Sequence, residues 1–504
     1  MPFTRRHLAI AGVLFAMLST LFTSPQAASS SEFFPSTPGE MHTPTGYQKM
    51  QEFLATLKGI DFIQVSKIAT STKGRDVMMV HLNRGKKENA TKVFLLGSQH
   101  GDEHAGKDAL LYMINEMAHD PKMLPENIDL TILPMFNPDG TEADQRRNGA
   151  DADLNRDHVM HDQPEIKALY STFQSIMPHV FVDCHEYERD SEGWRAQGIV
   201  KYPTITMGST NNPYAAEPVR RLAEKWVKNA AEKMGDISYS EYTVGGAPPD
   251  DEQRFSTTDT DDARNGTGIY GTVSFIIEAG RFGWIKGRQV DLGKRVEAYH
   301  RLLWFVIHSA AESDAAQKAV AESRSRPLGD FIPVNYMWAN LGGKVHAVNA
   351  VDIATSKTVQ VQTVNFMGDF VVKRNVRRPE AYAIPPSANS AAFAALLKEH
   401  AIPYETLSTE KTVTVEPAKL LSVETETDPL YNRFDGRQIV EYAKQEKRTL
   451  PAGTIMVSPM TGQAGRRACI LLEPMMLYSI YQYPAFRKTV GEDGMIPVLR
   501  VLKD

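Results

Sequence analysis

The stretch KVFLLGSQHGDEHAG, residues 92–106, decides the fold of this chain. Its first six residues form an apolar run typical of a buried strand, and a helical pattern begins at Ala105. The loop between them carries the polar side chains of His100 and Glu103. In open parallel sheets, ligands collect beyond the carboxyl ends of the strands, where loops meet helix N-termini. The stretch therefore predicts a sheet strand with functional side chains at its end.

Strand and helix patterns alternate over the first two thirds of the chain. Strands are expected at residues 76–82, 92–97, 128–136, 179–185 and 272–280, and helices at 105–118, 163–177, 214–234 and 290–318. This alternation predicts an α/β domain with a mixed, largely parallel sheet flanked by helices.

A second apolar strand ends in a potential metal ligand, because His185 follows the run FVDC at 181–184. His100, Glu103 and His185 would then meet at neighbouring strand ends. Two imidazoles and one carboxylate form the ligand set of an open catalytic zinc site, which predicts one Zn²⁺ per chain.

A second zinc hypothesis uses the string H-x-x-E-H from His100 to His104, which matches the inverted zincin motif. That motif needs an uninterrupted helix to bring both histidines to one face. Gly101 and Gly106 weaken a helix here, and a strand precedes the string. We rank this hypothesis second.

The chain resembles the carboxypeptidase A-like zinc carboxypeptidase family from about residue 46 to residue 311. The motifs that carry the resemblance are IATSTKGR at 68–75, NPDG at 137–140, RRN at 146–148, DLNR at 153–156 and SFIIE at 274–278, besides the two metal-binding stretches. The three-ligand zinc set is itself the one known from carboxypeptidase A. The resemblance implies a zinc-dependent metallocarboxypeptidase that hydrolyses C-terminal peptide bonds.

The resemblance also implies roles for individual residues. Glu278 would be the general base that activates the zinc-bound water. Asp153 would accept a hydrogen bond from the non-ligating nitrogen of His100 and fix that ring. Arg146, chosen over its neighbour Arg147, would polarise the scissile carbonyl.

Substrate binding is implied for a further pair, Asn155 and Arg156, which would hold the free α-carboxylate of the substrate. Digestive members carry a tyrosine before the base, and we find none at the matching spacing in residues 256–270. We expect Arg264 or Tyr270 to contact the substrate instead. Side-chain preference cannot be carried over from the family.

The length of 504 residues favours two domains. We expect a catalytic domain at 29–325 and a smaller C-terminal accessory domain, α+β or β-rich, at 326–504. A hydrophobic fraction of 42% and a charged fraction of 23% fit a globular protein. The formal net charge of -5 gives no basic field, so no nucleic-acid partner is expected.

The first 28 residues have the order of a bacterial-type signal peptide. Arg5 and Arg6 precede an apolar run at 8–21, and small residues follow near 27–28. We expect cleavage, no stable membrane span afterwards, and a periplasmic or secreted protein; the Sec and twin-arginine routes both stay open. Cys184 and Cys469 are the two cysteines, so a single bridge stays open but a disulfide framework is excluded.

Three functions compete at this stage. The first is a carboxypeptidase acting on peptides or peptidoglycan fragments. The second is a zinc amidase, deacylase or endopeptidase acting on peptidoglycan stem peptides or acylated amino acids. The third is a non-catalytic binding module, which the presence of all three ligands and Glu278 disfavours, because a binding protein has no need of a base.

Overall fold

The computed structural model describes residues 33–282, 291–423, 427–428, 433–434, 438–460, 462–477 and 479–503. The signal peptide expected at 1–28 lies outside these residues. Within them, the helices are all too short or too polar to cross a bilayer.

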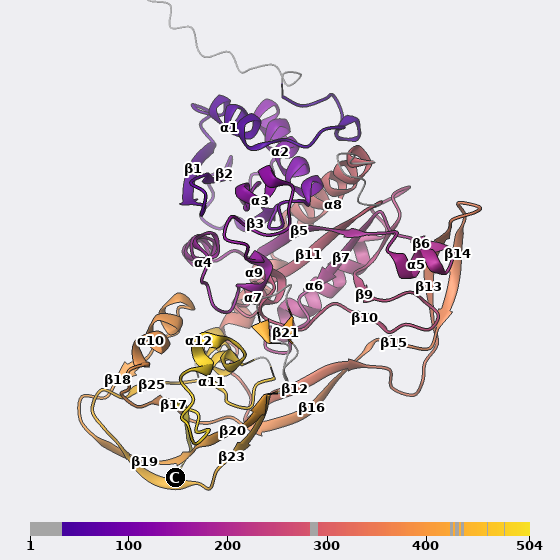
Figure 1. Ribbon diagram of the computed structural model, residues 1–504. Coiled ribbons are helices and arrows are strands. Elements are labelled where there is room, and N and C mark those ends of the chain that lie inside the picture. The colour runs from indigo at the N-terminus through magenta and orange to yellow at the C-terminus, as the bar shows by residue number, and fades with distance from the viewer. Residues whose placement is uncertain are drawn as a thin grey trace, which may run out of the picture.

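An eight-stranded mixed sheet organises the molecule (Figure 1). Its strands, in spatial order, are β1 (Ile63–Thr70), β2 (Asp76–Leu82), β4 (Ile128–Leu133), β3 (Thr91–Gly97), β5 (Val180–Glu188), β11 (Val273–Arg281), β7 (Ile205–Ser209) and β8 (Tyr239–Glu241). The central strands β4, β3, β5 and β11 run parallel. Strands β1 and β2 pair antiparallel with their neighbours, and β7 is antiparallel to β11 but parallel to β8. This confirms the predicted mixed, largely parallel sheet.

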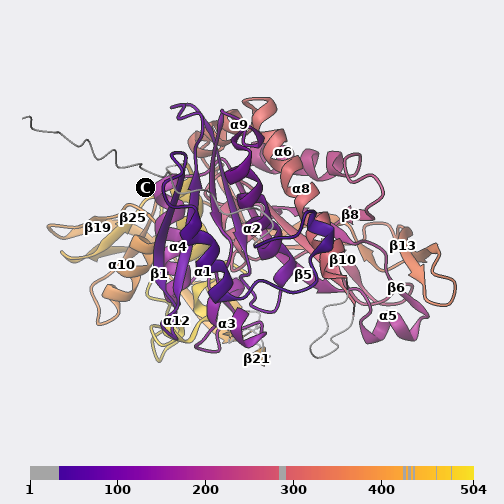
Figure 2. The same ribbon diagram turned by 90° about the horizontal axis from the view of Figure 1, so that it is seen from above.

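Helices cover both faces of this sheet (Figure 2). The helices of this part of the chain are α1 (Tyr47–Thr56), α2 (His104–His119), α3 (Pro138–Ala143), α4 (Pro164–Ile176), α5 (Glu192–Ala196), α6 (Glu217–Ala230), α7 (Ala263–Gly268), α8 (Leu292–Glu312) and α9 (Ala315–Ser325), of which α5 lies beside β6, outside this sheet (Figure 1). The helical pattern expected at 290–318 is therefore two helices. The chain leaves the first one at Ser313, where the backbone is extended.

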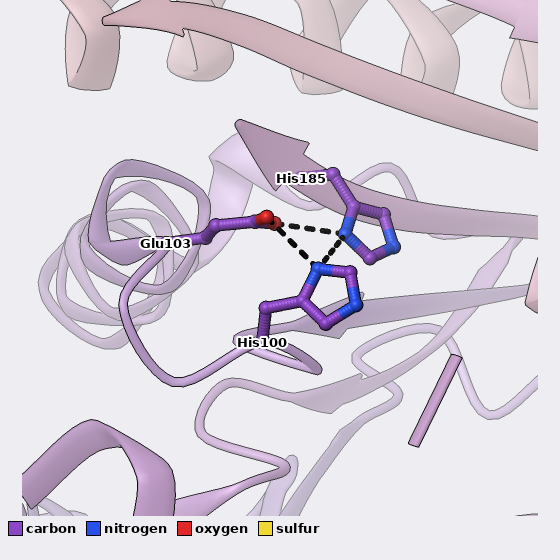
Figure 3. A group of neighbouring side chains, drawn as sticks. All are labelled: His100, Glu103 and His185. Carbon is purple, nitrogen blue, oxygen red and sulfur yellow. Dashed lines mark hydrogen bonds and ion pairs between the residues drawn. The ribbon is translucent and has the colours of Figure 1, made fainter. Parts of the chain in front are cut away.

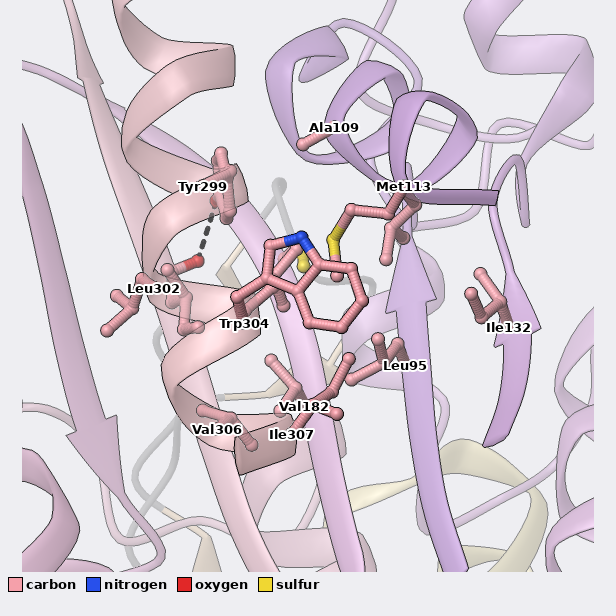
Figure 4. Packing of buried hydrophobic residues seen from close by; sticks show 14 of the residues in the cluster. Leu95, Ala109, Met113, Ile132, Val182, Tyr299, Leu302, Trp304, Val306 and Ile307 are labelled. Carbon is pink, nitrogen blue, oxygen red and sulfur yellow. Dashed lines mark hydrogen bonds between the residues drawn. The ribbon is translucent and has the colours of Figure 1, made fainter. Parts of the chain in front are cut away.

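Side chains alternate between two cores along each central strand, as the pleat requires. In β3, Val93 and Leu95 enter one core, while Phe94 and Leu96 enter the other. The first core is closed by α2, α6 and α8; Figure 4 shows residues of α8 packed against β5, β3 and α2. Because both faces of the strand are buried, its sequence is a continuous apolar run.

The C-terminal part is β-rich with few helices, as expected. Its elements are β12 (Phe331–Ala339), β13 (His346–Asp352), β14 (Thr358–Thr363), β15 (Phe366–Met367), β16 (Asp369–Arg377), β17 (Ala381–Ile384), α10 (Ser390–Glu399), β18 (Glu405–Thr406), β19 (Lys411–Glu416), β20 (Ala418–Val423), β21 (Thr427–Asp428), β22 (Arg433–Phe434), β23 (Gln438–Tyr442), β24 (Glu446–Leu450), β25 (Ile455–Val457), α11 (Gly462–Leu472), α12 (Pro484–Arg487) and β26 (Leu499–Val501).

The two parts of the chain are joined by shared sheets and a shared core. Strand β13 pairs with β6 (Ile199–Lys201), and β15 pairs with β10 (Gln253–Phe255), whose other neighbour is β9 (Thr243–Gly245). The second core combines side chains of β3, β5 and α4 with those of β17, α10 and α11. Strand pairs and core contacts therefore cross the boundary expected near residue 325.

Both cysteines are buried and free, Cys184 on β5 and Cys469 on α11. Burial raises the pKa of each thiol above its ordinary value. The disulfide that the sequence left open is therefore not formed here.

Candidate metal centre and active site

Three side chains meet at the carboxyl ends of β3 and β5 (Figure 3). His100 Nδ1 and His185 Nδ1 lie 3.0 Å apart, and the two carboxylate oxygens of Glu103 lie 2.8 Å from one ring nitrogen each. All three residues are buried, and among the described residues they form a cluster of potential ligands within 4.8 Å of one another. The sequence analysis named this same set.

Local backbone structure places two of these ligands. His100 follows the end of β3, and Glu103 is the residue before the first turn of α2. Gly101 lies between them against the backbone of Gly140, and a Cβ at Gly101 would collide with it. The absence of a side chain at Gly101 thus lets the ligand loop lie on α3.

Carboxylates hold the outward-facing nitrogens of both rings. Asp153 Oδ1 lies 3.1 Å from His100 Nε2, and Asp183 Oδ2 lies 2.6 Å from His185 Nε2. Asp183 in turn accepts a hydrogen bond of 3.2 Å from the amide of Gln99. Such partners fix the orientation of a metal-binding imidazole and direct its other nitrogen to the metal.

The donor set fits zinc. Two imidazole nitrogens and a carboxylate converge from one side, which is the arrangement of an open zinc site. Burial raises the pKa of Glu103, but His100 and His185 outweigh it and hold that pKa well below the ordinary value. The carboxylate is therefore charged and ready to bind a cation.

Glu278 lies beside this centre because of strand register. In the parallel pair of β5 and β11, Glu278 is directly opposite His185. Burial and the Glu103 carboxylate raise the pKa of Glu278, while His185 and a hydrogen bond from Tyr242 act in the opposite direction; the net pKa lies above the ordinary value. A carboxylate with a raised pKa accepts protons more readily near neutral pH.

A cavity of about 350 Å³ surrounds the centre. It is lined by His100, Glu103, Arg146, Asn155, Arg156, His185, Glu186, Tyr187, Tyr242, Val244, Arg254, Ser256, Thr257, Asp262, Ile276 and Glu278. Seven of the residues proposed from the sequence line this cavity: His100, Glu103, Arg146, Asn155, Arg156, His185 and Glu278. An eighth, Asp153, does not line the cavity but contacts His100 from behind.

The polar side chains at the cavity have defined partners. Arg146 donates from Nε to Asp153 at 2.9 Å and is about one third exposed (36%). Asn155 accepts from the backbone of Ala263 at 2.8 Å, and its amide nitrogen lies 3.2 Å from His185 Nε2. Arg156 donates to the carbonyl of Asn155 at 2.6 Å. These contacts hold two guanidinium groups beside the metal centre.

The structure does not bring Arg264 and Tyr270 to the cavity. Arg264 is buried and bonds to the carbonyl of Thr257 and the carboxylate of Asp262. Tyr270 lies in the second core, under the guanidinium of Arg467. Their positions give no support to a substrate contact, so neither enters the proposal below.

The inverted zincin hypothesis does not fit the structure. His104 begins α2 and its Nε2 lies 2.9 Å from Asp144, away from the three ligands. The helix starts too late to place His100 and His104 on one helical face.

Two residues at the site were missed from the sequence. Asp183 stands two residues before His185 and shares its face of β5, which is a signal that the strand period could have supplied. Tyr242 follows β8 and bonds to Glu278, although 36 positions separate them in the chain. Tyr242 reaches Glu278 because β8 pairs in parallel with β7, and β7 in turn pairs with β11.

Comparison with known proteins agrees with this geometry. Residues 50–248 match the zinc carboxypeptidase family. A carboxypeptidase 2 of Trichophyton tonsurans is 26% identical over 230 residues, which cover 42% of each chain. A zinc carboxypeptidase of Saccharothrix mutabilis subsp. capreolus is 31% identical over 136 residues, covering 24% of this chain and 30% of that protein. The chain thus matches less than half the length of these relatives.

Among solved structures, a metallo-carboxypeptidase from Burkholderia cenocepacia has a TM-score of 0.42 and 18% identity, covering 53% of this chain and 70% of that one. A metallo-carboxypeptidase from Pseudomonas aeruginosa has a TM-score of 0.41 and 19% identity, with the same coverage. Glu278 lies beyond the matched residues, whereas all three metal ligands lie within them. Residues 50–248 are therefore similar to zinc carboxypeptidases.

Proposed function

We propose that this chain is a zinc metallocarboxypeptidase that removes residues from the C-terminus of peptides. The observation that carries the proposal is one cavity that holds a zinc-type donor set, the carboxylate of Glu278 and the side chains of Asn155 and Arg156. A zinc ion bound there supplies Lewis-acid chemistry and makes water a stronger nucleophile at neutral pH.

Side chains of the protein would carry out the other steps of the reaction. Glu278 takes a proton from the attacking water and delivers it to the leaving amine. Arg146 lies beside the zinc donors and stabilises the negative charge that develops on the carbonyl oxygen. Asn155 and Arg156 bind the terminal carboxylate, because a guanidinium fork matches a planar anion.

The experiment is a mass-spectrometric time course on a mixed pool of peptides, each supplied as the free acid and as the C-terminal amide. We expect a ladder from the free acids and a roughly ten- to hundredfold lower kcat/KM for the amides, since a charge-assisted hydrogen bond contributes about 1.5–3 kcal/mol.

Arg156→Ala should reduce the difference between acid and amide. Arg147→Ala is the matched control, because Arg147 donates to the carbonyl of Asp151 and does not line the cavity. Equal cleavage of both peptide forms, or internal cuts, would replace the proposal with an amidase or endopeptidase. Peptidoglycan stem peptides, tested alongside, would identify a cell-wall substrate.

The proposal includes export to the periplasm or the exterior after removal of residues 1–28. N-terminal sequencing of the mature protein tests this part. A mature chain that still begins at Met1 would contradict it.

A further inference from the structure

A second cavity, which we call the Trp194 cavity, adjoins the metal centre. Its volume is about 500 Å³, within the range of roughly 300–1,000 Å³ that small-molecule sites occupy. Tyr187, Tyr242 and Val244 line both this cavity and the metal cavity. The two cavities are therefore neighbours that share these lining residues.

Aromatic side chains form part of the walls of the Trp194 cavity, together with polar groups such as Lys201. Trp194 and Phe366 are 5% and 8% exposed, and Phe255 meets Phe366 edge to face with ring centroids 5.5 Å apart. Tyr187 and Tyr242 add two rings on the side of the metal centre. Aromatic rings offer large apolar area in fixed geometry, which suits an aromatic or bulky apolar guest.

The far wall comes from the C-terminal part of the chain. Ala347 and Val348 belong to β13, which pairs with β6, and Phe366 belongs to β15, which pairs with β10. Figure 1 shows β13 and β14 standing beside α5 and β6 at the edge of the molecule. The cavity is therefore completed only when residues 346–368 pack on the first part of the chain.

The direction of the substrate follows from the proposed function. If Asn155 and Arg156 hold the terminal carboxylate, the C-terminal residue occupies the metal cavity. The chain on the acyl side of the scissile bond must then leave past the metal centre, and the Trp194 cavity is the adjoining space.

We propose that the Trp194 cavity binds an aromatic or other large apolar side chain of the substrate, on the acyl side of the scissile bond. The inference rests on the proposed carboxypeptidase function for its direction. It identifies the substrate class as peptides with a bulky apolar residue one or two positions before the C-terminal one.

Three peptides test the proposal: acetyl-Gly-Gly, acetyl-Gly-Phe and acetyl-Phe-Gly, each joined to one fixed C-terminal residue. We expect kcat/KM to be about tenfold higher for at least one of the phenylalanine peptides, as burial of an aromatic side chain predicts. A fourth peptide with Glu in place of Phe should gain nothing. No gain from Phe, or a larger gain from Glu, would overturn the proposal.

The variant Ala347→Trp fills the cavity from an exposed strand position that lies outside the catalytic machinery. It should remove the advantage of the phenylalanine peptides and leave acetyl-Gly-Gly turnover unchanged. Val345→Trp is the matched control, because Val345 is 55% exposed and does not line the cavity. If Ala347→Trp instead changes the preference for the C-terminal residue, the cavity binds the leaving side and the proposal is wrong.

Binding measurements separate this inference from the proposed function. Calorimetric titration of the same peptides into zinc-loaded Glu278→Gln requires no turnover. Tighter binding of the phenylalanine peptides, abolished by Ala347→Trp, supports the cavity even if the wild-type protein cleaves nothing. Equal affinities for Phe and Gly peptides overturn it even if the protein is a carboxypeptidase.

Discussion

His185 and His104 distinguish the two zinc hypotheses at the scale of single residues. His185→Ala removes a donor from the convergent set and should abolish stoichiometric zinc binding, whereas His104→Ala should keep about one zinc per chain. Metal analysis after dialysis measures both, with circular dichroism as the check on folding. Zinc loss confined to the His104 variant would restore the inverted zincin arrangement.

Glu278 can be tested without disturbing the metal. Glu278→Gln is nearly isosteric and should retain zinc, but it cannot accept a proton, so kcat should fall by roughly 10²–10⁴. Glu188→Gln provides the control, because Glu188 is exposed at the end of β5. Near-normal turnover of Glu278→Gln would remove the residue from the mechanism.

Asp183 carries a prediction that the sequence alone did not suggest. Its carboxylate lies 2.6 Å from His185 Nε2, so Asp183→Asn should weaken zinc binding by roughly 10–100-fold. Asp144→Asn alters a similar pair with His104, which lies outside the candidate ligand set, and should leave zinc affinity unchanged. Competition with a chelator measures the affinities; equal values for both variants would contradict the role.

The three ligands could be predicted because each stands at the end of an apolar strand or in the loop that follows it. Glu278 could be predicted for the same reason. Tyr242 could not, since only the tertiary course of the chain after β8 brings it to Glu278. Arg264 and Tyr270 lie close to Glu278 in sequence. The side chain of Arg264, however, bonds to Asp262 two residues away, and Tyr270 is buried in the second core.

At the scale of elements, Asp139 ties α3 to the turn that follows β1. Its buried carboxylate accepts from Arg75 at 2.8 Å and from the backbone of Lys73 at 2.9 Å. Burial raises the pKa of Asp139, but these hydrogen bonds outweigh it and lower that pKa below the ordinary value. The folded protein therefore gains stability from the charged form.

Asp139→Asn should lower the free energy of unfolding at pH 7 by roughly 1–3 kcal/mol. Because the pKa of Asp139 is lower in the folded state, its contribution is complete above about pH 4 and is lost as the pH falls through the folded pKa. Urea unfolding at pH 7 and pH 3 should show a difference between variant and wild type that shrinks in acid. Asp151→Asn, at a side chain that is 87% exposed, is the control; a difference independent of pH would refute the account.

Strands were more predictable than helix boundaries. The five strands expected in the first part all exist, since continuous apolar runs leave little alternative to a buried strand. The pattern at 290–318 gave no sign of the break at Ser313, because apolar spacing continues from α8 into α9 while the backbone turns.

For the whole molecule, the shared core predicts one cooperative unit. The second core contains residues from both sides of residue 325, so the intact chain should unfold in a single transition. Differential scanning calorimetry tests this. A chain ending at residue 325 should be markedly less stable, because Phe94, Phe173 and Tyr270 would lose the core partners that the C-terminal part supplies. Two separate transitions, or a fragment as stable as the intact chain, would contradict the prediction.

Composition and a loop-like boundary correctly indicated a β-rich C-terminal part. They could not indicate that β13 and β15 add to small sheets of the first part, because edge pairing between distant segments leaves no local pattern. The walls of the Trp194 cavity were unpredictable for the same reason.

The pairing of Glu278 with His185 across β5 and β11 has a consequence for protein production. Side chains alternate along a strand, so a slip of one residue in this pair would turn Glu278 away from His185 and place Ile277 there instead. A chain misaligned in this way could keep its zinc and much of its helical content. In a refolded preparation, circular dichroism and metal content would then be similar for the correctly paired and the misaligned chains. Specific activity per bound zinc would differ between them and would identify the correctly paired protein.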